Sequence, residues 1–247
     1  MNARLLAVLA AALLLIPGAP ARAAELISTD QEIAIGRRAA AQLEAQFGLI
    51  ADPARAETVT RIGTRLAAMS TRPQLPWTFR VLNTSQVNAI SLPGGFIYVT
   101  RGMMSFVQSP DELAFVVGHE VGHVEKRHHV ALIQRDFLFT IVVSLVLGRD
   151  PGTAQIADLL GALLQRGFSR EAEFEADTEG VTLTHRAGFN AASGLSFMER
   201  LRTAEGRDPS QVEVLFRTHP ALGDRIVRVR ALLRRLGYRV ALQRGAA

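Results

Sequence analysis

Two histidines four residues apart, with a glutamate directly after the first, are the residues of this chain best suited to chemistry. They are His119, Glu120 and His123, in the run from Val116 to His123. On an α-helix, residues four apart lie on one face, so both imidazoles could bind a single divalent metal. Glu120 could then reach a water molecule on that metal. Imidazole and carboxylate suit zinc, although the same pattern also occurs on polar helix faces that bind nothing.

His129, ten residues after His119, is one candidate for a third ligand. This spacing is used in zinc sites where a glycine turns the chain back toward the metal. Lys126 stands where that glycine is needed, so His129 is a poor candidate. We instead expect His128 and His129 to lie on a basic, solvated helix end.

Two acidic residues in the segment from Ser169 to Asp177 are better candidates. Read as a helix, Glu173 and Asp177 share one face. Glu173 could be the third zinc ligand, and Asp177 could accept the spare N–H of a ligating histidine. The alternative is a solvated acidic helix face. Apolar neighbours argue against that alternative; they are Ala172, Phe174, Ala176 and Val181.

The helix that carries the two histidines has a clear start. Ser109 can cap it and Pro110 suits its first position. Gly118 and Gly122 are poor helix formers, each costing about 1 kcal/mol relative to alanine. We therefore expect another element, or a substrate, to approach this helix closely at the two glycines.

Residues 96–100 form a strong strand pattern that follows a glycine-containing turn. At the edge of a sheet, such a strand could hold an extended peptide by main-chain hydrogen bonds. On this interpretation Gly94, Gly95, Phe96 and Ile97 bind substrate. The alternative is an ordinary interior hairpin.

Other segments show helix or strand patterns. Thr29 and Glu32 fit a capping box at the start of one helix. The apolar run 137–147 is too short to span a bilayer, and we place it in a helical hairpin inserted at about 130–166. A flap that touches a membrane or covers the cleft is the alternative for this run. Helices are expected at 29–47, 53–69, 153–165, 190–201 and 221–236, and a strand at 77–82.

Composition narrows the classes of function. The chain has 247 residues, 48% hydrophobic and 21% charged, which favours a single globular domain over residues 24–247 with its core at about 30–236. Its lack of cysteine excludes disulfides, thiolate metal sites and cysteine nucleophiles. The formal net charge is +5, but the arginines are scattered and no aromatic-basic module accompanies them, so we expect no nucleic-acid partner.

Residues 1–23 have the pattern of a secretory signal peptide. Arg4 precedes an apolar run from Leu5 to Ile16, and Ala21-Arg22-Ala23 is a small-x-small cleavage site. The mature protein would begin at Ala24 and be periplasmic. The alternative is an uncleaved anchor helix, which would need about 20 apolar residues.

Taken together, the motifs resemble the zinc endopeptidase family that includes the CAAX prenyl endopeptidase, HtpX and Oma, and within it the exported bacterial members of BepA and LoiP type. The resemblance covers roughly residues 30–235. The residues that carry it are Asn88, Leu92 to Ile97, His119 to His123, Ser169-Arg170 with Glu173, Ala176-Asp177, Thr218-His219-Pro220 and Asp224-Arg225-Ile226.

The resemblance implies a fold and a set of roles. The fold would be α+β and mostly helical, a gluzincin-type metallopeptidase domain with a small sheet whose edge strand borders the active-site helix. The two motif histidines and Glu173 would bind one zinc ion, Glu120 would be the catalytic carboxylate, and Asp177 would support a ligand. His219 would lie near the metal, where it could occupy the fourth position at rest or stabilise the oxyanion; a capping or core histidine is the alternative.

The resulting prediction is a zinc-dependent endopeptidase. Its substrates would be polypeptides, including misfolded envelope proteins, in periplasmic or outer-membrane protein quality control, with peripheral membrane contact. One alternative is a latent or non-proteolytic periplasmic chaperone or adaptor that retains its zinc site. A second is a zinc hydrolase acting on a non-peptide substrate.

Overall fold

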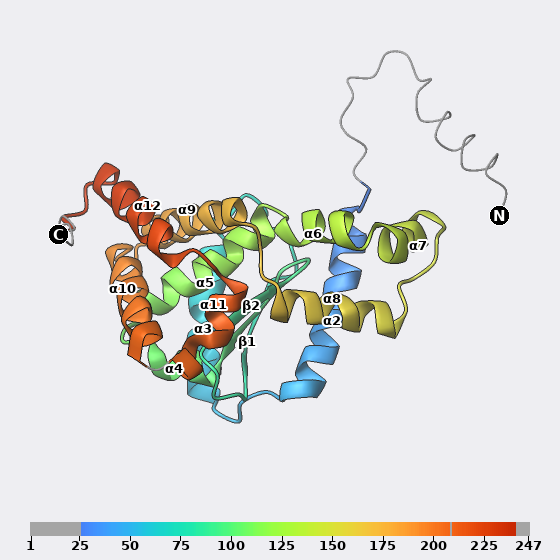
Figure 1. Cartoon of the computed structure of the whole chain (residues 1–247), viewed down its shortest axis with the longest axis horizontal. Helices are drawn as coiled ribbons and strands as arrows, with labels where there is room; N and C mark the ends of the chain where they lie inside the picture. The colour runs from blue at the N-terminus through green and yellow to red at the C-terminus, as the bar shows by residue number, and fades with distance from the viewer. Residues whose placement is uncertain (1–25, 208, 241–247) are drawn as a thin grey trace, which may run out of the picture.

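Most of the chain is helical, as the sequence predicts. The computed structural model describes residues 26–207 and 209–240, so the predicted signal peptide lies outside the described residues (Figure 1). The strands are β1 (Thr78–Leu82), β2 (Ala89–Leu92) and β3 (Phe96–Thr100). The helices are α2 (Thr29–Phe47), α3 (Pro53–Ala67), α4 (Arg101–Phe106), α5 (Pro110–Glu125), α6 (His128–Asp136), a π-helix (Leu138–Val142), α7 (Val143–Val146), α8 (Thr153–Gln165), α9 (Arg170–Arg186), α10 (Ala192–Arg207), α11 (Pro209–Thr218) and α12 (Leu222–Arg235). This confirms the α+β, mostly helical fold class.

Strand β3 is the central strand of the sheet, so the prediction that it is an edge strand is wrong. The strand order is β1-β3-β2, with β3 parallel to β1 and antiparallel to β2. Both sides of β3 are paired, so Phe96 and Ile97 cannot bind a peptide through their main chain. The sequence misled because all four side chains of β2 are buried, which removes the alternation that marks an edge strand. The interior-hairpin alternative is correct.

Gly94 and Gly95, the other residues expected to bind substrate, form the turn between β2 and β3. Their φ angles of 78° and 100° lie in the region that favours glycine. A Cβ atom on Gly94 would lie 2.6 Å from the Cα of Ile33, and one on Gly95 would lie 3.3 Å from the Trp77 ring. The two glycines therefore serve close packing of the turn against α2 and Trp77.

Helix α2 begins with a capping box, but one residue earlier than predicted. Ser28 accepts a hydrogen bond from the backbone of Gln31, and the Gln31 side chain accepts one from the backbone of Ser28. The predicted pair of Thr29 and Glu32 is therefore wrong. Glu32 is fully buried and instead binds the Arg72 guanidinium through both carboxylate oxygens, at 2.9 Å each.

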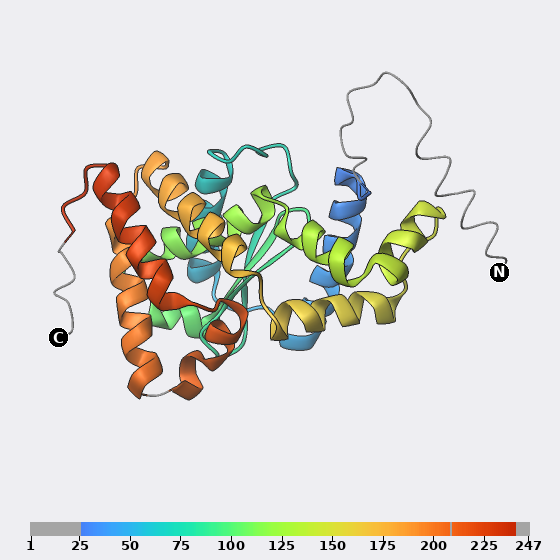
Figure 2. The ribbon, with the colours of Figure 1, turned by 45° about the horizontal axis from the view of Figure 1, so that its top comes forward.

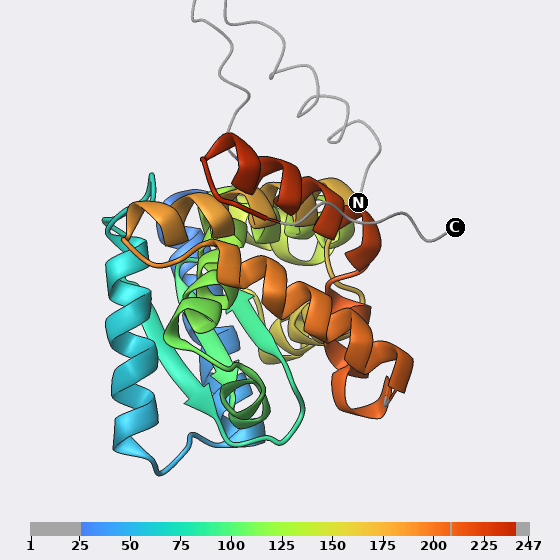
Figure 3. The same ribbon diagram turned by 90° about the vertical axis from the view of Figure 1, so that its left-hand side faces the viewer.

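Helix α5 lies at the centre of the molecule, and α9 packs closely along it. Ser109 caps α5, as predicted. A Cβ atom on Gly118 would lie 3.2 Å from the carbonyl oxygen of Gly180, and one on Gly122 would lie 2.9 Å from the Cβ of Glu179. The close approach expected at the two glycines is thus made by α9. Figure 3 shows α5 with α3 on one side and α10 on the other.

Two apolar clusters hold these elements together. The larger one joins α3, the sheet, α5 and the helices α9 to α12, and the smaller one joins α2, the sheet, α6 and α8. Figures 1 and 2 show the corresponding arrangement, with α2 beside α8 at one end and α9 beside α12 toward the other. Helix α5 runs between the two groups, so its side chains can meet residues from both.

Residues 128–165 form α6, the π-helix, α7 and α8. Val146 and Leu147, near the end of the apolar run, are 65% and 62% exposed. Within the described ranges, no single helix has the length and apolarity to cross a membrane. By length and composition alone, only the helices His128–Asp136 and Thr140–Val146, bent by 97° to each other, would qualify as a pair.

Candidate metal centre

Four side chains that can bind a metal meet at one point in the structure. His119 and His123 come from α5, Glu173 comes from α9, and His219 lies just before α12. All four are buried, with exposed fractions between 0% and 8%. One potential ligand atom from each lies within 4.8 Å of those from the other three.

The spacing of these ligand atoms suits a four-coordinate ion. The Nε2 atoms of His119 and His123 are 3.1 Å apart. The two Glu173 oxygens lie 3.4 Å from the His123 Nε2 and 3.6 Å from the His119 Nε2. The Nδ1 of His219 lies 3.3 Å from the His119 Nε2 and 3.2 Å from each Glu173 oxygen. Metal–ligand bonds of about 2.1 Å in a tetrahedron separate ligand atoms by roughly 3.4 Å, so the four positions fit such an ion.

Asp177 and Arg225 contact this set and hold two of its side chains, His119 and Glu173, in place. The Asp177 Oδ1 lies 3.0 Å from the His119 Nδ1. Because the His119 Nε2 faces the other ligand atoms, its Nδ1 carries the proton and donates to Asp177. Arg225 binds both Asp177 oxygens at 2.7 Å and a Glu173 oxygen at 2.7 Å, and it donates to the His219 carbonyl oxygen at 3.1 Å. Arg225 thereby fixes two carboxylates at once.

The local electrostatics keep the carboxylates ionised and one imidazole neutral. Burial alone would raise the pKa of Glu173, but His219 and Arg225 hold it well below its ordinary value. Burial likewise opposes ionisation of Asp177, while Arg225 lowers the pKa of this carboxyl group. Burial lowers the pKa of His123 well below its ordinary value. The His123 ring is therefore neutral and able to bind a metal.

Charge balance also favours a cation in this place. Three buried carboxylates, those of Glu120, Glu173 and Asp177, face one buried guanidinium, that of Arg225. Even with a protonated His219 ring, three negative charges would face two positive ones, and such an excess is costly in a buried site. A divalent ion would neutralise it, so the chemistry of the set agrees with its spacing.

Glu120 lies beside the four ligand atoms. One of its oxygens accepts a hydrogen bond of 2.6 Å from the Ser91 hydroxyl, and the other lies 3.6 Å from the His219 Nε2. Burial alone would lower the pKa of His219, but the carboxylates of Glu173 and Glu120 raise it. Glu120 thus lies beside this set, with one oxygen held by Ser91 and the other free of strong hydrogen bonds.

Comparison with known proteins identifies the family. Residues 53–233 match Peptidase family M48. The chain belongs to this family. It is 28% identical to the beta-barrel assembly-enhancing protease of Yersinia pestis, over 86% of this chain and 46% of the relative. It is 30% identical to the putative beta-barrel assembly-enhancing protease of Vibrio cholerae, over 83% and 44%. It is also 31% identical to the mitochondrial metalloendopeptidase OMA1 of Schizosaccharomyces pombe, over 69% and 51%.

The match confirms the family predicted from the sequence motifs. The chain spans about half the length of the curated relatives it matches. M48 peptidases are metal-dependent, and within the part of the chain that the structure describes, the four-residue set is the buried cluster that could hold a metal ion.

Two further histidines of this M48 chain are placed differently from the prediction. His129 is fully buried and donates from Nε2 to the carbonyl oxygen of Ser91 at 2.8 Å. His128 is 9% exposed and contacts His123. The expectation of a solvated helix end was wrong because the chain does turn back, at Arg127 rather than at a glycine. Arg127 adopts the left-handed conformation, with φ 58° and ψ 34°.

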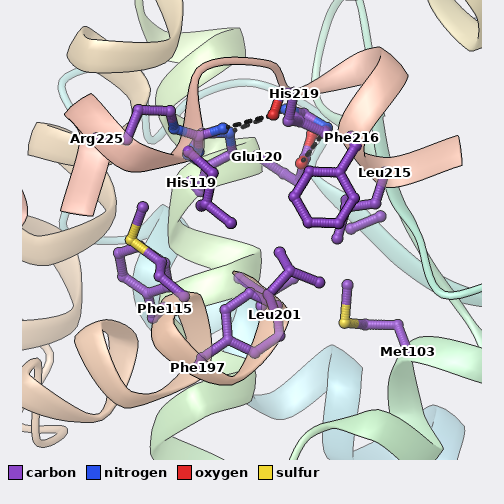
Figure 4. Close-up of a pocket in the computed structure, with 14 residues that line it drawn as sticks. Met103, Phe115, His119, Glu120, Phe197, Leu201, Leu215, Phe216, His219 and Arg225 are labelled. Carbon is purple, nitrogen blue, oxygen red and sulfur yellow. Dashed lines mark hydrogen bonds and ion pairs between the residues drawn. The ribbon is translucent and has the colours of Figure 1, made fainter. Parts of the chain in front are cut away.

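An apolar pocket adjoins Glu120 and His219 (Figure 4). Its volume is about 40 Å³. The side chains point into it from α4, α5, α10 and α11; they include Met103, Phe115, Phe197, Leu201, Leu215 and Phe216. A second, narrower cleft of about 10 Å³ lies between β2 and the end of α8, where Leu163 and Phe168 face Ser91 and Glu120.

From the sequence, Arg225 was named only among the residues that carry the family resemblance, and it was given no role. Helical periodicity could have found it, because Arg225 shares the apolar face of α12 with Leu222, Ile226 and Val229, all of them buried. A charged residue on a buried helix face requires a partner. The acidic pair on α9 supplies it.

Proposed function

We propose that this M48 protein is a zinc-dependent endopeptidase, with zinc held by His119, His123 and Glu173. The observation that carries the proposal is the tetrahedral spacing of the buried ligand atoms beside a carboxylate, Glu120, that is not needed to hold the ion. A purely structural zinc site needs four ligands and no general base. A catalytic site needs both an exchangeable fourth position and a base.

Zinc, when bound, would supply Lewis acidity that polarises a peptide carbonyl and lowers the pKa of water, so that deprotonated water can attack that carbonyl. Glu120 takes the proton of the attacking water and passes it to the leaving amine. Ser91 holds the other carboxylate oxygen of Glu120, so that the proton-accepting oxygen keeps its direction. Arg225 and Asp177 keep Glu173 and His119 oriented.

His219 has two roles in this proposal. In the described conformation its Nδ1 occupies the fourth ligand position, so substrate can bind only after this side chain moves. Once it leaves that position, a ring N–H of His219 can donate a hydrogen bond to the developing oxyanion. His219 is therefore proposed as a residue that blocks the site at rest and assists catalysis when displaced.

Substrate is proposed to bind along β2 instead of β3. Among the described residues β2 has no strand partner on its outer side, and it lines the narrow cleft next to Glu120. Its small present volume means that the covering residues Leu163 and Phe168 must shift to admit a peptide. The apolar pocket next to Glu120 would then receive an apolar side chain flanking the cleaved bond.

The proposed substrates are misfolded proteins of the bacterial envelope. Two relatives carry the name beta-barrel assembly-enhancing protease, and the signal-peptide pattern at residues 1–23 supports export to the periplasm. The exposed apolar residues Val143, Val146 and Leu147 support association with a membrane.

The second candidate function is a chaperone or adaptor that retains a closed zinc site. The position of His219 and the narrow cleft favour it, because both oppose substrate entry. The two functions differ in whether peptide bonds are broken.

The deciding experiment compares wild-type protein with Glu120→Gln and with Glu57→Gln, which alters an exposed glutamate on α3. Zinc content and cleavage of casein and of an unfolded outer-membrane protein are measured on the same preparations. We expect one zinc ion in all three, and cleavage by Glu120→Gln at least about 100-fold slower than by the other two. Full cleavage by metal-checked Glu120→Gln would refute the base assignment. Suppression of aggregation by wild-type protein without any cleavage would favour the chaperone.

A further inference from the structure

The second histidine of the motif needs a fixed proton position. The Nε2 of His123 faces the other ligand atoms, 3.1 Å from the His119 Nε2 and 3.4 Å from a Glu173 oxygen. To bind a metal through Nε2, the neutral ring must carry its single proton on Nδ1. A buried N–H of this kind requires an acceptor. For His119 the acceptor is Asp177, but no carboxylate among the described residues contacts the Nδ1 of His123.

The atom that faces the His123 Nδ1 is the Nδ1 of His128, at 2.9 Å. Two ring nitrogens at this distance form a hydrogen bond only if one carries a proton and the other does not. Since His123 must donate, the Nδ1 of His128 must accept. His128 then carries its own proton on Nε2.

The next contact agrees with this proton arrangement. The Nε2 of His128 lies 3.1 Å from a carboxylate oxygen of Glu175, a pure acceptor. Every donor from His123 to Glu175 therefore meets an acceptor, with one direction of donation throughout.

Packing between aromatic rings also fixes the orientation of His123 and His128. Phe168 stacks on His123 with ring centroids 4.1 Å apart and planes inclined by 23°. The His128 ring meets the His123 ring edge-on, with centroids 5.0 Å apart and planes at 74°. Because Arg127 adopts the left-handed conformation, the chain turns back after α5 and places His128 against His123, five residues earlier in the sequence.

We propose that His128 and Glu175 are positioning residues for the metal site: His128 accepts the Nδ1 proton of His123, and Glu175 fixes the His128 tautomer that makes this possible. The inference rests on the proposed zinc site. Each histidine ligand then has its own acceptor, Asp177 for His119 and the His128–Glu175 pair for His123. Glu175, whose side chain is 60% exposed, acts on the metal only through His128.

The test measures the Zn²⁺ dissociation constant of the whole protein by competition with a chelator of known affinity. The variants are His128→Ala, Glu175→Ala, the double variant, and Glu171→Ala as a control one helical turn earlier on the exposed side of α9. We expect His128→Ala to weaken Zn²⁺ binding by about 10- to 100-fold. Glu175→Ala alone should weaken it by less. Glu171→Ala should match wild-type protein.

The double variant separates this relay from two independent effects. If Glu175 acts through His128, its loss has no further effect once His128 is gone, so the double variant binds Zn²⁺ like His128→Ala. Additive losses would overturn the proposal, as would an unchanged dissociation constant in His128→Ala. Because Glu175 is exposed, its variant should unfold in urea with chelator present at the same concentration as the Glu171→Ala control.

Nitrogen NMR of ¹⁵N-histidine-labelled, Zn²⁺-loaded protein gives a readout that a merely structural role would not move. We expect the His128 ring to carry its proton on Nε2 in wild-type protein and to become a mixture of tautomers in Glu175→Ala. A proton on Nδ1 of His128 in wild-type protein would overturn the proposal. Wild-type protein that binds Zn²⁺ with these features but cleaves no polypeptide would refute the proposed function and leave this inference standing.

Discussion

Replacing Arg225 by methionine should strongly destabilise the metal-free protein. Arg225 is 5% exposed and binds Asp177 through two contacts and Glu173 through one, all at 2.7 Å. Methionine fills much of the same space but leaves both carboxylates buried without their counter-charge. Removing one partner of a buried ion pair costs about 3–5 kcal/mol. For a domain of this size, that loss lowers the melting temperature by roughly 6–20 °C.

The stability lost in Arg225→Met should depend on pH and on Zn²⁺. Arg225 lowers the pKa of both Asp177 and Glu173, so its stabilisation is present above their unfolded pKa values and disappears as pH falls through their folded values. The difference between Arg225→Met and wild-type protein should therefore narrow as pH is lowered below about 4. Added Zn²⁺ should restore part of the stability, because it supplies positive charge to Glu173.

The assay is urea unfolding with a chelator, followed by circular dichroism, at about pH 7 and at about pH 3. Arg235→Met, which removes an exposed arginine near the end of the same helix, is the control and should change the free energy of unfolding by less than about 0.5 kcal/mol. A loss below about 1 kcal/mol in Arg225→Met, or a loss that grows as pH falls, would refute the reasoning.

Two further predictions concern the buried histidine His129 and the closely packed glycine Gly122. Burial lowers the pKa of His129 to about 3, so the unfolded protein binds one more proton than the folded protein between about pH 6.5 and pH 3, and stability falls as pH falls. His129→Gln should reduce this slope by up to about 1.4 kcal/mol per pH unit in urea titrations; an unchanged slope would contradict the assignment. Gly122→Ala should destabilise the protein by about 1–3 kcal/mol because its Cβ would lie 2.9 Å from Glu179, whereas Gly161→Ala, where the space is open, should stabilise α8 slightly; equal melting temperatures would contradict the close packing.

The parts of the site that sequence reasoning found are those set by local rules. Helical periodicity places His119 and His123 on one face of α5, and it places Glu173 and Asp177 on one face of α9. A serine followed by a proline marks where α5 begins. The poor helix formers Gly118 and Gly122 predicted a close neighbour, which is α9. These inferences need only the chain within a few turns.

The parts that it missed depend on contacts between distant segments. Strand β2 is recognisable only from its pairing with β3, since burial of all its side chains hides the pattern. The burial of His128 and His129 follows from a left-handed arginine, which no local rule favours over a glycine. Glu32 fits a capping box by spacing, but its pairing with Arg72, 40 residues away, takes it out of that role.

The left-handed turn at Arg127 has a consequence for protein engineering. A scaffold that borrowed only α5 would acquire both imidazoles but neither the acceptor for His123 nor the bond that anchors β2 through His129. The native chain tolerates the strained residue, at a cost of roughly 1–3 kcal/mol, because its guanidinium donates to the Ile27 carbonyl oxygen at 2.7 Å and lies 3.1 Å from Glu32. A transplant of this motif would have to include that tether, or exchange the arginine for a glycine.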